Sequence, residues 1–208
     1  PGRRAQGGAP GLEPRRHKVG AHDHHLQTLQ GDRGRILDAA TGTPASLFAM
    51  GAGHPHIRKA MNPGLVYNLT GKDYAAFLCA AKYDLKSFGM NHRCEENTTY
   101  RVEDLNYPTF SVLLAANTTG STKVVFRRRL TNVGHMAAIY KVKTKAPDGI
   151  KMLVRPKKLH FSRKNQERRY SVRFVVKKTR LSGSTLDGSI LWIHGKHEVK
   201  SRAVFFWS

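Results

Sequence analysis

The residues best suited to chemistry lie near the start of the sequence, in the stretch GLEPRRHKVGAHDHHLQ at residues 11–27. A metal site in this stretch would use its four imidazoles: His17, His22, His24 and His25. Metal ligands need a folded scaffold and a surrounding shell of hydrogen bonds to hold them in place. Residues 1–34 are rich in Gly, Arg, His and Gln and show no apolar period of 2 or 3.6, which predicts disorder. We therefore expect neither a metal site nor a cofactor.

The same segment carries basic residues that could contact a phosphate backbone. They are Arg3, Arg4, Arg15, Arg16 and Lys18. Proteins that bind single strands interleave such charges with aromatic side chains on which the bases stack. Residues 1–34 contain no Phe, Tyr or Trp. Any nucleic-acid binding by this segment would be non-specific, and no specific nucleic-acid partner is expected.

Two cysteines and three glycosylation sequons form a second group of residues with possible chemistry. The sequons begin at Asn68, Asn97 and Asn117, and the cysteines are Cys79 and Cys94. Three sequons with a cysteine pair among them favour a secreted glycoprotein, in which the two cysteines are expected to form a disulfide. Closing a loop of this length would contribute roughly 3 kcal/mol in the chain-entropy interpretation. Two buried free thiols are the alternative.

The positive charge of the chain is concentrated in its second half. The formal net charge is +22, and residues 123–180 hold 19 Lys and Arg against two acidic residues. The main interpretation is a solvated basic surface, because these charges alternate along predicted strands. An alternative is a face that binds a polyanion such as an anionic polysaccharide. Its residues would be Lys141, Lys143, Lys145, Arg173 and Lys177. No run of eighteen apolar residues occurs, so no membrane partner is expected.

Periodicity predicts one helix followed by a set of short strands. Thr70 with Asp73 is typical of an N-terminal capping arrangement, and the helix should end near residues 82–84. One helical face would carry Tyr74, Phe77, Leu78 and Ala81. From about residue 104 the period changes to 2, and turn signals separate seven or eight short strands, the last two joined near Gly195. This pattern predicts a β-sandwich.

The inner face of the predicted sandwich is apolar with one exception. Its residues include Val124, Phe126, Leu130, Tyr140, Val142, Tyr170, Val172, Phe174 and Val176. Arg128 falls among them at an inward position.

Several motifs resemble the plant subtilisin-like serine proteases (subtilases). The stretch FAMGAGHPHIRKAMNPGLVYNLTGKDYAAFLC resembles the end of that family's catalytic domain. DLNYPTFSV, RRLTNVG, YKVKTKAPDGIKMLVRPKKLHF and LWIHGKHEVKS resemble its C-terminal fibronectin type III-like domain. The resemblance covers residues 35–208 almost without a break. It implies a mainly β fold in which residues 35–103 are an α/loop remnant of the subtilisin-like α/β catalytic domain plus a helical connector. Residues 104–207 would then form a fibronectin type III-like β-sandwich.

The catalytic machinery of that family is not found in this sequence. The family's nucleophile is a Ser in a Gly-Thr-Ser-Met motif, and its Asp and His lie much earlier. The stretch Gly42-Thr43-Pro44-Ala45-Ser46 looks similar, but Pro44 interrupts the motif and the stretch matches a segment beyond the nucleophile. A Ser-His-Asp triad acts only when its three members are together. We expect no catalytic residue here, although the resemblance implies a secreted parent endopeptidase of the apoplast or cell wall.

Residues 1 to about 34 stand where the family has a helix, and a shifted reading frame would supply one. Permissible codons from Leu12 onward, read with the first base dropped, encode W-S-P-A-A-I-K-S-A-L-M-T-T-T-Y. This string contains three Ala together with Ile, Leu and Met, and it is amphipathic as a helix. We therefore interpret residues 1–34 as an out-of-frame segment, and a non-functional pseudoprotein fragment stays an alternative. Transcript sequencing across residues 1–40 would decide.

The resemblance also implies a missing partner. Phe48, Met50 and Leu65 are expected to have packed on the rest of the catalytic domain. Left exposed, they would form an apolar patch that favours association, for example as a homodimer.

Overall fold

A computed structural model describes residues 25–26, 37–43, 45, 54–55, 57–89, 93–95, 98–116, 120–134, 137–177 and 180–208. Its helices are α3 (Ile57–Met61), α4 (Gly71–Ala80) and the 3-10 turns η1 (Leu85–Phe88) and η2 (Val102–Asp104). Its short early strands are β1 (His25–Leu26), β2 (His54–Pro55) and β3 (Leu65–Val66). The later strands are β4 (Phe110–Leu114), β5 (Thr122–Asn132), β6 (Ala138–Lys145), β7 (Ile150–Arg155), β8 (Lys158–Phe161), β9 (Glu167–Val176), β10 (Thr185–His194) and β11 (His197–Trp207). None of the helices in these ranges is long and apolar enough to cross a bilayer.

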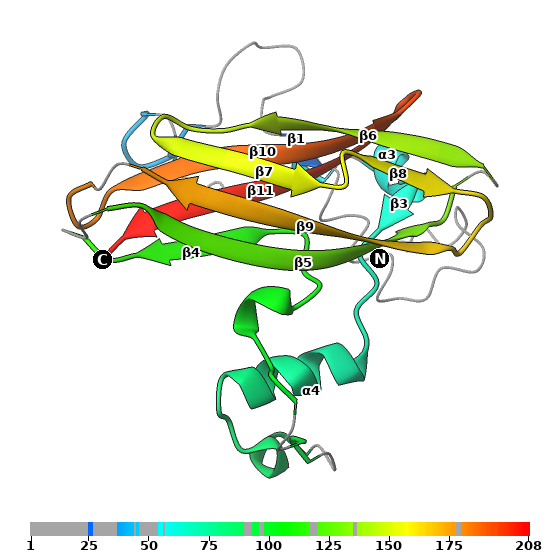
Figure 1. Ribbon diagram of the computed structural model, residues 1–208. Coiled ribbons are helices and arrows are strands. Elements are labelled where there is room, and N and C mark those ends of the chain that lie inside the picture. Colours follow the sequence, from blue (N-terminus) through cyan, green and yellow to red (C-terminus); the bar gives the residue numbers. More distant parts are fainter. Residues whose placement is uncertain are drawn as a thin grey trace, which may run out of the picture.

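Most of the described chain forms two sheets that face each other (Figure 1). One sheet has the strand order β4-β11-β10-β6-β8 and the other β3-β5-β9-β7. All neighbours pair antiparallel except β4 and β11, which are parallel. β10 and β11 form the hairpin expected near Gly195, with His194 opposite His197. The prediction of a mainly β fold with a sandwich is confirmed.

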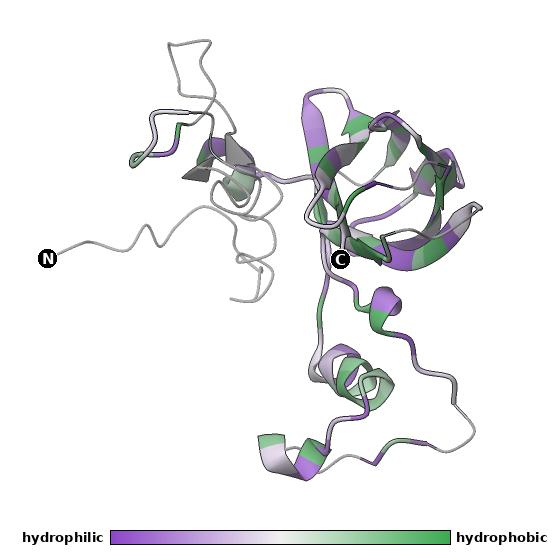
Figure 2. Cartoon of the chain, turned by 90° about the vertical axis from the view of Figure 1, so that its left-hand side faces the viewer, coloured by the Kyte–Doolittle hydropathy of each residue, from purple (hydrophilic) through white to green (hydrophobic). Residues whose placement is uncertain are grey.

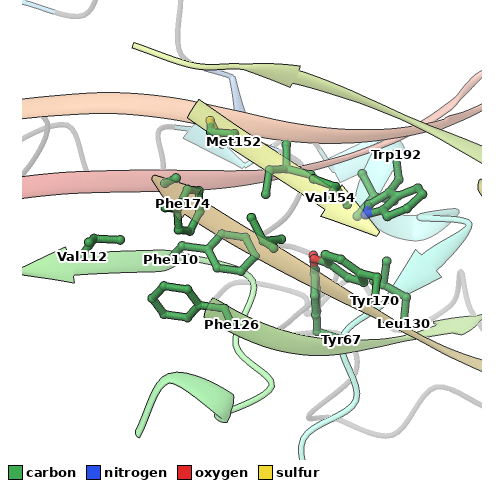
Figure 3. Close-up of a cluster of buried hydrophobic side chains, with 14 of the residues drawn as sticks. Tyr67, Phe110, Val112, Phe126, Leu130, Met152, Val154, Tyr170, Phe174 and Trp192 are labelled. Carbon is green, nitrogen blue, oxygen red and sulfur yellow. The ribbon is translucent and has the colours of Figure 1, made fainter. Parts of the chain in front are cut away.

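The core lies between the sheets and is supplied by alternate residues, as a period of 2 requires. Along β7, and along β9 from Tyr170 onward, every second side chain is buried and those between are more exposed. The strands accordingly carry both apolar and polar residues (Figure 2). Phe110, Phe126 and Phe174 meet edge to face, with ring centroids 5.4–5.7 Å apart (Figure 3). Trp192 packs on Tyr170 at 5.2 Å. Such rings bury large areas and prefer this geometry.

The connector is the segment that carries α4, η1 and η2, and the chain just before it belongs to the sandwich. β3 pairs with β5, placing Leu65 opposite Asn132 and Val66 opposite Thr131. Leu65 is 0% exposed, so the prediction that it packed on an absent domain and was left exposed is wrong. The reason is that Leu65 fills the core of the sandwich itself. Phe48 and Met50 lie outside the described residues.

Tyr67 continues this anchoring at a buried hydroxyl cluster. Its Oη lies 2.5 Å from Tyr170 Oη and 2.6 Å from Ser201 Oγ, and the two tyrosine side chains point toward each other in Figure 3. Tyr170 is on β9 and Ser201 on β11. One side chain from the upstream segment therefore links the two sheets.

The connector lies below the sandwich in both views (Figures 1 and 2). Its helix α4 starts at the predicted capping box, where Thr70 accepts from Asp73 N and Asp73 accepts from Thr70 N. The predicted face is less buried than expected, since Tyr74 is 40% exposed and Phe77 and Leu78 are half-buried. Ala75 is the buried residue of this helix. Helical spacing correctly predicts which side chains share a face. That face stays partly exposed because little of the sandwich lies against this helix.

Residues 1–34 are described only at β1. His25 pairs with Pro55 and Leu26 with His54 in a two-residue antiparallel bridge. The other residues for which disorder was predicted lie outside the described ranges.

A buried guanidinium occupies the inward position that the sequence marked as the exception. Arg128 is 4% exposed, and its Cζ lies 4.7 Å from the ring centroid of Phe110 and 5.2 Å from that of Phe126. It donates to four backbone carbonyls: Glu103 at 2.5 Å, Tyr107 at 2.8 Å, Arg127 at 2.8 Å and Thr109 at 3.3 Å. A buried charge is tolerated only when it is paired or fully hydrogen-bonded. Arg128 thus holds the segment that enters β4 against the core.

We expect Arg128→Met to lower the free energy of unfolding by about 3 kcal/mol, because the variant leaves buried carbonyls without donors. Urea denaturation followed by tryptophan fluorescence measures the change. Arg127→Met is the matched control and should cost less than about 1 kcal/mol, because that side chain is largely exposed. Equal losses in the two variants would contradict the proposed clamp.

Gly64→Ala should also destabilise the fold, by about 3 kcal/mol, since it combines backbone strain with a steric clash. Gly64 has a φ of +75°, and an added Cβ would lie 2.9 Å from His197 Cγ and still closer to Tyr140 Oη. Gly120→Ala is the control, because its φ is +94° but nothing lies within 4 Å of the added atom. In the control the free energy of unfolding should fall only by the cost of the backbone strain, about 1 kcal/mol. If both variants unfold at the same urea concentration, the close contacts around Gly64 do not contribute to the loss of stability.

Candidate functional site

The outer face of the four-stranded sheet carries a cluster of arginines. In register, Arg127 and Arg155 both lie opposite Ser171, from the two sides of β9. Arg129 lies opposite Arg169. Arg173, two residues beyond Ser171, lies opposite Val125 and Leu153. We call Arg127, Arg129, Arg155, Arg169 and Arg173 the arginine face.

The connector brings carboxylates to one side of this face. Asp104 accepts from Arg127 Nη1 and from the Arg127 backbone, each at 3.0 Å. Asp73, the capping residue of α4, forms an ion pair with Arg129. The other Asp73 oxygen accepts from Thr70 N at 2.8 Å. The same carboxylate therefore begins the helix and attaches it to the sheet.

Asn106 and Glu167 complete the contacts of Arg129. Asn106 Oδ1 accepts from Arg129 N at 2.7 Å, and Asn106 Nδ2 donates to Asn68 O at 3.0 Å. Glu167 Oε2 lies 4.0 Å from Arg129 Nε. These contacts hold the chain on both sides of the connector against β5.

A cleft of about 500 Å³ lies where the connector meets the sheet. It is lined by Asp73, Asp104, Asn106, Arg127, Arg128, Arg129, Arg155, Arg169, Tyr170 and Ser171. Burial lowers the pKa of Arg128 below its ordinary value, but an arginine stays protonated in proteins. The cleft thus has a strongly positive wall, and its chemistry suits an anion with planar oxygens, such as a carboxylate.

Two arginines of the cleft differ from their neighbours. Arg155 and Arg169 are exposed, and their guanidinium groups form no ion pair with any residue that the structure describes. Ser171, between Arg127 and Arg155 in register, is half-buried, and its hydroxyl lies 3.5 Å from Arg155 O. These three groups are the part of the cleft open to a further ligand.

The five residues predicted to share a polyanion-binding face do not lie on one surface. Lys141, Lys143 and Lys145 are exposed on β6, in the five-stranded sheet. Arg173 is on β9 and Lys177 follows that strand, in the other sheet. Since both sets point away from the core, they face opposite sides of the sandwich. Alternation placed each residue outward correctly, but it could not tell which sheet a strand joins.

The cysteine pair is brought together in the connector. Cys79 and Cys94 form a disulfide, with Cα atoms 5.7 Å apart. Cys79 is in α4, and the disulfide closes the loop that follows this helix and contains η1.

The other predicted sites are placed only in part. Asn68 is half-buried beside the start of the connector, whereas Asn97 and Asn117 lie outside the described residues. Pro44 and Ser46 of the stretch that looks like the nucleophile motif lie outside them too, as do His17, His22 and His24. In the described ranges no three His, Cys, Asp or Glu side chains gather as metal ligands would.

The sequence indicates the arginine face only indirectly, and periodicity alone does not predict it. In KVVFRRRLT, ERRYSVRF and the end of β7, arginines occupy the outward positions of three strands. Their convergence depends on the order β5-β9-β7 and on its register. Neither can be deduced from alternation within a single strand.

Comparison with known proteins identifies the fold and its relatives. Residues 104–205 match the family described as "Fibronectin type-III domain". Subtilisin-like protease SBT1.7 of Arabidopsis thaliana is 41% identical over 178 residues, covering 83% of this chain and 23% of that protein. SBT1.4 of the same plant is 39% identical, again over 83% of this chain and 23% of the relative. Subtilisin-like protease SBT3 of Solanum lycopersicum is 34% identical over 85% of this chain and 24% of its own length.

The chain therefore spans about a quarter of the length of these relatives. With the sandwich at residues 104–205 and similarity that continues upstream of it, the chain belongs to the plant subtilisin-like protease family and carries its fibronectin type-III domain.

Proposed function

We propose that this chain is the C-terminal accessory region of a secreted plant subtilisin-like serine endopeptidase and does not itself hydrolyse peptides. The sequence lacks the family's nucleophile motif. Hydrolysis by a serine protease needs a nucleophile, a base and an orienting carboxylate in contact. The role assigned to the chain is to fold as a stable body and to support a catalytic domain that precedes it.

The observation that carries this proposal is the anchoring of the upstream segment. β3 completes the four-stranded sheet, and Tyr67 reaches both sheets through Tyr170 and Ser201. A chain that enters the sandwich through a buried strand cannot swing freely about it. The chain is therefore held firmly on the sandwich from Leu65 onward, which is what an accessory domain needs to stabilise a neighbour that precedes it.

A chimera tests the supporting role. In SBT1.7, the stretch that matches this chain would be replaced by this chain, and the product compared with SBT1.7 truncated before that stretch. We expect the chimera to be secreted and to cleave a fluorogenic peptide, whereas the truncated protein should lose at least about tenfold in secreted activity. A chimera carrying Gly64→Ala is the control and should give an intermediate yield. Equal activity of the truncated protein and the chimera would refute the role.

Labelling with a serine-directed reagent tests the proposal that the chain does not hydrolyse peptides. Purified chain should not react with a fluorophosphonate that labels serine nucleophiles, while intact SBT1.7 in the same reaction should be labelled. Labelling of the chain that competes with a peptide substrate would show a nucleophile that the sequence does not reveal.

A second candidate function is binding to an anionic cell-wall polysaccharide. It is favoured by the exposed row of Lys141, Lys143 and Lys145 on β6. Retention on a pectate column at physiological salt, weakened about tenfold by Lys141→Gln/Lys143→Gln, would support it. Elution at low salt would indicate an unspecific basic surface.

A further inference from the structure

We propose that the arginine face is a docking site for an extended acidic polypeptide segment, whose carboxylates bind Arg155 and Arg169 beside Ser171. This inference concerns a surface of the sandwich itself and does not depend on the accessory role. It assigns a partner chemistry to the open part of the cleft.

The arginines next to Arg155 and Arg169 already bind carboxylates of a polypeptide. Asp104 pairs with Arg127, and Asp73 pairs with Arg129. Both carboxylates come from the connector, which crosses this side of the sheet through η2 and α4. Arg155 and Arg169 present the same guanidinium chemistry on the adjacent strands, and no described carboxylate reaches them.

The distance between Arg155 and Arg169 matches the spacing of alternate side chains in an extended peptide. Arg155 lies opposite Ser171, and Arg169 is two residues before Ser171, so the two arginines are diagonal neighbours on adjacent strands. Such neighbours have Cβ atoms about 7 Å apart. Alternate side chains of an extended peptide are also spaced by about 7 Å. Carboxylates at positions i and i+2 of one strand can therefore reach both arginines at once.

The surface beside these arginines is partly aliphatic. Leu153 is 37% exposed and lies beside Arg173, opposite it in register, with Val125 on the other side. These aliphatic groups suit the apolar side chains of a peptide. Sugars commonly stack on exposed aromatic rings, but Tyr170, the aromatic residue of the cleft lining, is 3% exposed. The surface therefore favours a polypeptide over a polysaccharide.

Fluorescence anisotropy of a labelled peptide in which Glu and Thr alternate tests the site, with the full chain as the binding protein. We expect Arg155→Gln/Arg169→Gln to weaken binding at least about tenfold. Lys141→Gln/Lys143→Gln removes the same charge from the opposite side of the sandwich and should change affinity less than about twofold. Both variants alter exposed residues, and matching thermal unfolding would show that each is folded.

Two further ligands separate the alternatives. A peptide of the same composition with its Glu residues in adjacent pairs should bind more weakly, because only one carboxylate of each pair then faces the sheet. An oligogalacturonate should bind more weakly than the alternating peptide and without dependence on Arg155 and Arg169. Arginine-dependent binding of the oligogalacturonate that exceeds peptide binding would overturn the polypeptide assignment. Equal losses in the arginine and lysine variants, or no peptide binding at all, would overturn the site.

Discussion

The structure depends on one buried cation, the guanidinium of Arg128. Its position on β5 points into a core of phenylalanine rings, where an unpartnered charge would prevent folding. Four backbone carbonyls and two aromatic faces compensate it. Three of those carbonyls belong to residues 103–109, so the cost of burying the charge is offset only when that segment lies against the sheet. The return path from the connector into β4 is thereby fixed.

Connector and sandwich are joined at several points, and each joint uses a different interaction. Upstream, β3 contributes backbone pairing and Tyr67 contributes a buried hydroxyl cluster. At the sheet surface, Asp73 and Asp104 bind arginines that flank Arg128 in the sequence. Ion pairs of this partly exposed kind contribute little stability individually. Their consequence is geometric, because they hold η2 and the first turn of α4 at the surface of β5 and so form one wall of the arginine cleft.

The positions of the sheets change what the net charge of the chain predicts about its ligands. A net charge of +22 would predict a diffuse attraction to any polyanion. The fold divides the basic residues between two opposite surfaces. One is a row of lysines on β6, and the other is a set of arginines on β5, β7 and β9. Lysines act as hydrated point charges, whereas arginines bind planar carboxylates with two parallel hydrogen bonds. The two surfaces therefore differ in the ligands they select.

The sequence by itself determined the elements and their inward faces. The change to a period of 2 after residue 104, the capping pair Thr70–Asp73 and the turn near Gly195 all reflect local physics, which the neighbouring residues decide. It also marked Arg128 as an exception without showing what would satisfy its charge. Only the tertiary structure decided that Leu65 is core, that the five proposed polyanion ligands lie on opposite faces, and that five arginines from three strands line one cleft. Strand order and register come from contacts between residues distant in the chain, and alternation within a strand carries no information about them.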